Sequence, residues 1–460
     1  MVILFDFTFY KYWMVDEISI NTSCQLYKPS DYTYYITLKD NDVQEDLSDA
    51  IKSFDPDIIF WSAISSHLHS EGEYVSIQYG HELMKDLYVR AIKITGGLQP
   101  TATVQEIYKR FPAIDYFIRG ESELVLSELA DNLKNKEKFL STKGLCYRNN
   151  EQIIINPKQD IISNMDSISP YDYSLFENEV FFRPYNGRVV RAVDYELSRG
   201  CIYSCNYCVE SIIQRYYGFT ASKYGMLCNA SKYIRNKSAK VIFKELGIFN
   251  KEYRIDLIRC QDSNFLTIRR DVLEELADLM SNSDLSLMLY IETRSEGINS
   301  SSIKLLKKLK VDGVGIGVEI SAESFRKNNL NRFTVQEKIV NVFKLLKKAG
   351  IKRTTYNILG LPGEDESMII ETIKFNQLLN PDNISISFFS PYIGTEQQIK
   401  AKEMNYFNDY EYDLDDGLRS LSKSTLVNKK LLEFYKKYFV KLVREGIDKC
   451  DELKQMEGLK

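Results

Sequence analysis

The sequence predicts an α/β protein in which an N-terminal doubly wound parallel sheet is followed by a partial barrel of βα units and a short helical region. Three observations predict this class. Short apolar segments alternate with segments of helical periodicity, as in parallel βαβ units. The alternation pauses over residues 136–190, which are rich in Asn, Asp, Ser and Pro, and then resumes. The length of 460 residues suits several domains.

The first domain, residues 1–135, carries four predicted strands, each a short apolar or aromatic run. The runs are residues 2–9, 57–64, 88–95 and 115–119, with helical patterns at 43–54 and 73–86 between them. Strands that alternate with helices favour a parallel sheet with helices on both faces, as in Rossmann-like domains. Residues 136–190 form a connector in which we expect two strand pieces, at 144–147 and 152–156.

The second alternating series occupies residues 191–400. Its repetition predicts about six βα units, short of the eight of a complete barrel. Predicted strands lie at 189–197, 287–292, 313–319, 353–359 and 383–390, and predicted helices at 271–280 and 303–309. Thr334 and Glu337 form a candidate capping box for a further helix that ends at Gly350. Residues 401–460 are charged and helical, which is typical of a cap on the barrel.

Composition excludes several classes of protein. Hydrophobic residues make up 44% and charged residues 27% of the chain, which is globular rather than disordered composition. The net charge is −4 and no basic stretch stands out, so we expect no nucleic-acid partner. We expect no membrane association either, because no apolar run reaches the ~20 residues of a membrane helix. The first residues lack the pattern of a signal peptide. We therefore expect a cytoplasmic protein with reduced thiols.

Three of the eight cysteines lie close together in the chain. Cys201, Cys205 and Cys208 follow a C-x3-C-x2-C pattern, and three thiolates at this spacing can converge on one soft metal centre. A zinc site needs four ligands, or three and a water, and no histidine lies within ten residues of the motif. An iron–sulfur cube can be held by three cysteines, with one iron left open. The pattern favours iron and leaves zinc as the alternative.

With the aromatic Tyr207 before its last cysteine, the motif resembles the signature of radical S-adenosylmethionine (SAM) enzymes. Further motifs between residues 191 and 400 resemble the same superfamily. They are a D-x-x-F turn at 262–265, Thr293-Arg294 after a strand, a strand ending in Glu319, a G-L-P-G-E segment at 360–364 and an S-P-x-x-G-T turn at 390–395. The resemblance implies a partial (β/α)6 barrel of the TIM type.

The resemblance also implies a site. Cys201, Cys205 and Cys208 would hold a [4Fe-4S] cluster whose open iron chelates SAM. One electron would then release a 5′-deoxyadenosyl radical, which takes a hydrogen atom from a substrate. The cofactor-binding residues that it suggests are Tyr207, Asp262, Arg294, Glu319, Ile358, Gly360, Gly363 and Glu364. Polar residues at strand ends can instead cap the next helix, and glycines there can be ordinary turn residues.

The first domain resembles the cobalamin (B12)-binding domain that precedes many radical SAM barrels. Its predicted strand ends carry Ser62, Gly96-Gly97 and a G-E-x-E turn at 120–123. Ser62, Gly96 and Gly97 are the residues that the resemblance places at the cobalamin tail. The D-x-H-x-x-G motif of His-on domains is missing after the first strand, and His69 fits only part of it. The alternative is a Rossmann-like domain that has lost the cofactor or binds a substrate or partner.

Together these resemblances imply a cobalamin-dependent radical SAM enzyme. Methylation of an unactivated carbon or phosphorus of a small molecule or natural-product intermediate is the leading function. The alternative is a radical cyclase, oxidase or rearrangement enzyme that transfers no methyl group. Methylthio transfer to transfer RNA fits less well, because the N-terminal domain lacks three further cluster cysteines. A metal-stabilised sensor without turnover is the hypothesis from another class. A small-molecule substrate and an electron donor such as flavodoxin or ferredoxin are the implied partners.

Overall fold

The computed structural model describes residues 89–389 without 176–177, residues 392–406 and residues 429–459. Before residue 89 it describes short segments, namely 2–5, 8–10, 21–23, 33–35, 48–49, 51–53, 55–62, 81, 84–85 and 87. Most of the helical patterns expected at 43–54 and 73–86, the motif around His69, and residues 390–391 of the S-P-x-x-G-T turn lie outside the described residues.

The first sheet has seven strands in the order β4-β1-β5-β6-β7-β8-β9. The strands are β1 (Val2–Phe5), β4 (Thr33–Tyr35), β5 (Ile58–Ser62), β6 (Ile92–Gly97), β7 (Tyr116–Arg119), β8 (Leu145–Asn149) and β9 (Gln152–Ile155). The first five are mutually parallel, as predicted. The strand expected at 2–9 ends at Phe5, and Thr8–Tyr10 forms β2, which pairs with β3 (Asn21–Ser23) in a separate ribbon.

The two strands expected inside the connector extend the first sheet. β8 pairs antiparallel with β7, and β9 pairs antiparallel with β8. The sheet therefore continues to Ile155 instead of ending near residue 135. A tight turn between β8 and β9 lets these strands add to the edge as a hairpin, which needs no crossover helix. The connector also contributes β10 (Phe182–Tyr185), which is the edge strand of the second sheet and pairs antiparallel with residues 188–191.

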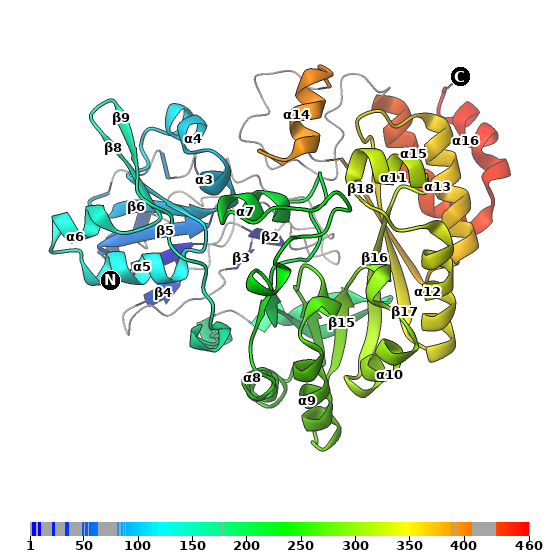
Figure 1. The fold of residues 1–460 in the computed structure, drawn as a ribbon, viewed down its shortest axis with the longest axis horizontal. Coiled ribbons are helices and arrows are strands. Elements are labelled where there is room, and N and C mark those ends of the chain that lie inside the picture. Colours follow the sequence, from blue (N-terminus) through cyan, green and yellow to red (C-terminus); the bar gives the residue numbers. More distant parts are fainter. Residues whose placement is uncertain are drawn as a thin grey trace.

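Helices cover both faces of the first sheet because neighbouring strand residues point to opposite sides. Phe117 of β7 belongs to a core with Ile107 of α4 (Val104–Arg110), whereas the adjacent Ile118 packs with Leu126 of α5 (Glu123–Asp131). The helices of this part are α3 (Leu98–Ala102), α4 (Val104–Arg110), α5 (Glu123–Asp131) and α6 (Lys136–Ser141). Figure 1 shows α3 and α4 on one side of the strands and α5 and α6 on the other.

The second sheet is a curled half-barrel in the order β10-β11-β14-β15-β16-β17-β18. Its strands after β10 are β11 (Arg188–Tyr195), β14 (Leu257–Cys260), β15 (Met288–Glu292), β16 (Val311–Glu319), β17 (Lys352–Leu359) and β18 (Asn383–Phe388). These six are parallel, which confirms the partial (β/α)6 barrel. A two-stranded ribbon of β12 (Ser198–Arg199) and β13 (Arg235–Asn236) stands beside it.

The barrel strands alternate with helices, most of which pack on the outer face of the sheet around its largest core. The helices are α7 (Glu210–Tyr216), α8 (Ala239–Lys251), α9 (Arg270–Ser281), α10 (Ser300–Lys308), α11 (Glu323–Leu330), α12 (Gln336–Ala349) and α13 (Glu366–Leu379). The capping box predicted for α12 is wrong. Val335 is the N-cap residue, and its apolar side chain cannot make a capping hydrogen bond. The Thr334 hydroxyl donates to the Glu296 carboxylate instead of capping the helix.

The last described residues are helical, as expected. α14 (Glu396–Glu403) is followed by α15 (Lys429–Glu445) and α16 (Cys450–Met456). α15 covers the end of the barrel sheet, since Leu432 and Phe439 form a core with Phe388 of β18. Among the described helices, none combines the length and the apolar character that a membrane crossing requires.

The two sheets meet through α7, the helix that follows the cysteine motif (Figure 1). Leu98 of α3 packs against Val209, Ile212 of α7 and Tyr392 in a small apolar core. The carboxyl ends of the first sheet therefore lie beside the segment that carries the three cysteines.

Candidate active site at the carboxyl end of the half-barrel

The cysteine motif forms a loop between β12 and α7. Cys201 and Cys205 are buried and Cys208 is partly buried. Gln214 of α7 donates hydrogen bonds of 3.0 Å to the carbonyl oxygens of Cys201 and Tyr203, which ties the loop back to the helix that follows it. The side-chain amide of Asn331 donates to the Ser204 carbonyl over 2.7 Å. The loop is thus fixed by the barrel on two sides.

The three thiols are free and sheltered from water. Burial raises the pKa of Cys201 to about 12 and raises that of Cys208. A guanidinium nitrogen of Arg294 lies 3.4 Å from Cys205 Sγ, within hydrogen-bond distance of the sulfur. Within the described residues, no three Cys, His, Asp or Glu side chains are gathered closely enough for a single metal ion. Three thiols without a histidine nearby in the sequence fit an iron–sulfur cube, which three cysteines can hold with one iron left open.

Arg294 follows β15, as predicted, and is held by several partners. Its guanidinium lies 3.7 Å from the ring centroid of Tyr203 and bonds to Glu296. It also donates to the Thr334 hydroxyl over 3.2 Å. Burial acts to raise the pKa of Glu296, but Arg294 outweighs burial and lowers the pKa to about 2. The pair therefore stays ionised beside the cysteine loop.

Glu319 ends β16 at a bulge and has a φ of 60°, a strained left-handed conformation for a non-glycine residue. Its Oε1 accepts a hydrogen bond of 3.0 Å from Tyr207 and one of 3.1 Å from Arg332. Arg332 also donates to the Tyr207 hydroxyl over 2.9 Å. Two predicted residues, Tyr207 and Glu319, are thus brought together by Arg332, which sequence reasoning missed. Arg332 lies in a loop after α11, outside every strand end, and carries no motif.

Several buried side chains near this end of the barrel have a polar atom without a hydrogen-bond partner in the described structure, and three of them are residues already discussed. They are Asp262, Glu364 and Arg332, through Oδ2, Oε1 and Nε. Asp262 follows β14 and accepts a hydrogen bond of 2.5 Å from Ser198, and burial raises its pKa to about 7. Buried polar groups in proteins are rarely unpaired, so these atoms are open to a hydrogen bond from water or a bound polar group.

The G-L-P-G-E segment forms a turn after β17 that its own residues stabilise. Glu364 Oε2 accepts hydrogen bonds from the backbone N–H of Gly360 and Leu361, at 2.5 and 3.1 Å. Burial raises the pKa of Glu364 to about 8. Gly360 and Gly363 both have positive φ, at 79° and 90°, which favours glycine here irrespective of any ligand. Ile358 is half-buried in β17, before the turn.

The interior of the half-barrel carries two tyrosines that sequence reasoning did not single out. Tyr290 and Tyr356 share a hydrogen bond of 2.8 Å between their hydroxyls, and Tyr356 donates to Glu292 over 2.8 Å. A Cβ at Gly315 of β16 would lie 2.8 Å from each hydroxyl oxygen. The glycine therefore makes room for the two rings. A strand alternation of Gly313, Gly315 and Gly317 with buried valine and isoleucine was the available signal.

Ser62, Gly96 and Gly97 meet at the carboxyl edge of the first sheet. Ser62 and Gly96 are register partners on β5 and β6, and Gly97 follows. A Cβ at Gly96 would overlap Ser122 Oγ, so packing by itself requires glycine there. Gly120, after β7, approaches the Tyr217 ring of the α7 end in the same way. At Gly96 and Gly120, neighbouring side chains lie directly against the glycine backbone.

Comparison with known proteins agrees with this arrangement. Residues 195–375 match the model of the radical SAM superfamily. An uncharacterised methyltransferase of Pyrococcus horikoshii is 27% identical over 403 residues, which cover 85% of this chain and 81% of that protein. The anaerobic magnesium-protoporphyrin IX monomethyl ester cyclase of Rubrivivax gelatinosus is 24% identical over 367 residues. These cover 78% of this chain but 61% of the cyclase.

Two solved structures share the fold over most of the chain. The radical SAM methyltransferase TsrM from Kitasatospora setae, solved with cobalamin and a [4Fe-4S] cluster, superimposes with a TM-score of 0.64 at 15% identity. The superposition covers 88% of this chain and 74% of TsrM. The cobalamin-dependent enzyme OxsB, solved with aqua-cobalamin bound, gives a TM-score of 0.62 at 15% identity. That superposition covers 89% of this chain and 62% of OxsB. Residues 195–375 are therefore a radical SAM domain, set within a two-sheet fold that the chain shares with TsrM and OxsB.

Proposed function

We propose that this chain is a cobalamin-dependent radical SAM enzyme that methylates an unactivated carbon or phosphorus of a small molecule. One observation carries the proposal. The sheltered loop of Cys201, Cys205 and Cys208 lies beside unpaired polar atoms at the carboxyl end of the barrel, and the glycine-lined edge of the first sheet packs against the helix that follows that loop.

The chain's own residues suit a cluster with SAM. The three thiols would hold a [4Fe-4S] cluster, and Arg294 would offset the negative charge at Cys205. When bound, the cluster supplies the electron that cleaves SAM to a 5′-deoxyadenosyl radical. Glu319 is held by Tyr207 and Arg332, and in this proposal it would accept a hydrogen bond from SAM. Asp262 and Glu364 offer further polar atoms to a ligand.

Cobalamin is proposed for the first sheet. TsrM and OxsB, which share the fold, were solved with cobalamin or aqua-cobalamin bound. Ser62, Gly96 and Gly97 lie at the edge where doubly wound sheets bind ligands. Residues 63–80 follow Ser62 directly and lie outside the described residues.

A radical cyclisation without methyl transfer is the second candidate. It is favoured by the similarity to magnesium-protoporphyrin ester cyclases from several organisms, at 21–24% identity. Because the methyltransferase of Pyrococcus horikoshii is matched over more of its length, methylation stays first. In both cases we propose a small-molecule substrate and a one-electron donor such as flavodoxin or ferredoxin.

The test uses the full-length chain, purified and reconstituted without oxygen and incubated with hydroxocobalamin. After desalting, the optical spectrum reports bound corrin, and 5′-deoxyadenosine is measured under reduction with SAM. We expect retained corrin bands together with deoxyadenosine release. Deoxyadenosine without retained corrin would leave a radical enzyme but contradict the cobalamin-dependent methylation.

A further inference from the structure

Two arginines stand side by side at the base of the cysteine loop. Arg199 of β12 and Arg235 of β13 are register partners in the two-stranded ribbon. Side chains of directly opposed residues project on the same face, where like charges repel each other. Arg199 is 18% and Arg235 7% exposed, so water screens this repulsion poorly. The ribbon is stable only if other groups supply negative charge.

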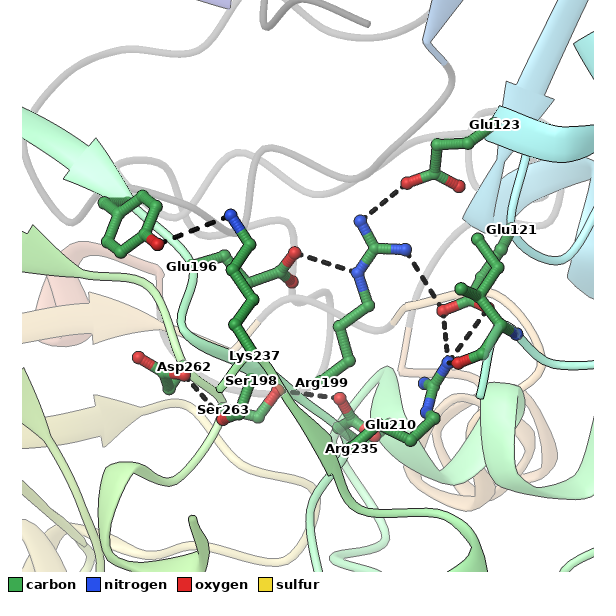
Figure 2. A network of polar contacts seen from close by, with 12 residues as sticks. Glu121, Glu123, Glu196, Ser198, Arg199, Glu210, Arg235, Lys237, Asp262 and Ser263 are labelled. Carbon is green, nitrogen blue, oxygen red and sulfur yellow. Dashed lines mark hydrogen bonds and ion pairs between the residues drawn. The ribbon is translucent and has the colours of Figure 1, made fainter. Parts of the chain in front are cut away.

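The first domain supplies that charge through its turn after β7 (Figure 2). Arg199 bonds to Glu123 over 2.6 Å and to Glu121 over 3.2 Å. Arg235 contacts both oxygens of Glu121, at 2.7 and 2.9 Å. Glu196, two residues before the ribbon, accepts a third bond from Arg199 at 2.8 Å. Figure 2 shows Arg199 reaching from the barrel side toward both glutamates.

The Glu121 turn is itself fixed on both sides. Its backbone N–H donates to the Tyr217 hydroxyl at the end of α7, over 2.9 Å. Its Oε2 accepts a bond of 2.8 Å from the backbone N–H of Ile162. The preceding Gly120 donates to the Thr101 hydroxyl over 2.8 Å. These bonds fix the position of the turn, so Glu121 can hold the two arginines in place.

The connection from Arg199 to the first cysteine is short. One residue, Gly200, separates Arg199 from Cys201, and its φ is 94°. A Cβ at Gly200 would lie 2.8 Å from the Tyr233 carbonyl oxygen. The backbone is packed tightly here and has little room to adjust. A displacement of Arg199 is therefore passed on to Cys201.

We propose that Arg199 and Arg235 are positioning residues, which fix the cysteine loop to the Glu121–Glu123 turn of the first domain. The loop is then held in its geometry by the domain that precedes the barrel as well as by the barrel itself. The inference rests on the proposed function for the identity of the group that the cysteines hold. The contacts themselves require no cofactor, so the positioning can be tested without one.

The test measures hydrogen exchange in the full-length chain without cluster. The variants are R199M, which removes the charge and the fork, and E123Q, which keeps the shape and removes the charge. Relative to wild type, we expect hydrogen exchange in peptides that span 199–217 to be at least about tenfold faster in R199M. In E123Q it should be faster by a smaller factor. The double variant R199M/E123Q should be no faster than R199M, because both changes break the same contact. Iron bound per chain after reconstitution should fall in the same order.

The matched control is a second arginine–carboxylate pair far from the loop. Arg353 of β17 is buried and bonds to both oxygens of Asp382, at 2.9 and 3.2 Å, at the amino-terminal ends of the last strands. D382N should speed exchange around β17 and β18 and leave residues 199–217 unchanged. Unchanged loop exchange in R199M, or an equal increase in all peptides, would overturn the positioning role. Such a failure would leave the proposed function untouched if wild-type protein still binds iron and cleaves SAM.

Discussion

The two parallel sheets present very different carboxyl ends. The barrel end carries ionised pairs, buried thiols and polar atoms without partners, among them Arg294 with Glu296 and the unpaired Oδ2 of Asp262. The described edge of the first sheet carries Ser62, Gly96, Gly97 and Gly120, and neighbouring side chains lie against Gly96 and Gly120. The same strand geometry thus serves two purposes. One end is equipped for charge and redox chemistry, and the other is shaped for close contact.

The largest expected effect comes from the cysteine loop. C201A should abolish cluster binding and lower SAM cleavage by more than about a hundredfold, because a lost ligand costs more than a lost neighbour of a ligand. Iron content and deoxyadenosine release measure this. C228S alters an exposed cysteine and serves as the control, which should retain both. If C201A released as much deoxyadenosine as wild type, the barrel end would not be the site of SAM cleavage.

Arg294 should have the next largest effect. R294M removes the cation beside Cys205 and takes away the ion-pair partner of Glu296. We expect a loss of about 10–100-fold in SAM cleavage or cluster retention, the range found for groups around metal ligands. R269M changes an exposed pair on the outside of the barrel and should have no effect. If R294M cleaved SAM and retained the cluster as well as wild type, the Arg294 cation would have no part in either.

Glu364 gives a pH-dependent prediction. Burial raises its pKa to about 8, so the fold favours the neutral acid. The stability that this provides is present below the usual pKa near 4.5 and is lost as pH rises through about 8. E364Q stays neutral, so its free energy of unfolding relative to wild type should rise by a few kcal/mol across that window, at about 1.4 kcal/mol per pKa unit. Urea unfolding at pH 5 and pH 9 measures it, and a constant difference would contradict the buried acid.

Gly96 tests the other sheet with the smallest expected effect. G96A places a Cβ on Ser122 Oγ and should destabilise the chain by about 1–3 kcal/mol. G96A/S122G should recover most of that loss, because the overlapping atom is removed. Corrin retention is measured on both variants. If the double variant is stable and still fails to retain corrin, Gly96 serves the cofactor as well as the packing.

The sequence predicted the barrel well because each unit repeats one local pattern. Ile339, Val342, Phe343 and Leu346 are all buried on α12, and Gly350 ends that helix in the left-handed conformation, as their spacing indicates. The cap at Thr334 was wrong because a tertiary partner, Glu296, takes the hydroxyl. Local rules cannot rank a helix cap against a hydrogen bond to a residue 38 positions away in the chain.

The candidate site could be predicted where motifs lie in one segment. The pairing of Tyr207 with Glu319 depends on Arg332, and the anchoring of Arg199 depends on Glu121 and Glu123. These contacts join residues that are up to 125 positions apart in the chain. The β8–β9 hairpin was likewise assigned to a connector, because nothing local tells a strand which sheet edge it will join.

The central claim is that the three cysteines hold a cluster whose open iron binds SAM at the barrel end. The most direct measurement is metal analysis with electron paramagnetic resonance of the reduced, reconstituted full-length chain, with and without SAM. We predict about four irons per chain and a cluster signal that changes when SAM is added, and both should be lost in C201A. Bound zinc in place of iron, or an iron signal that SAM leaves unchanged, would contradict the claim.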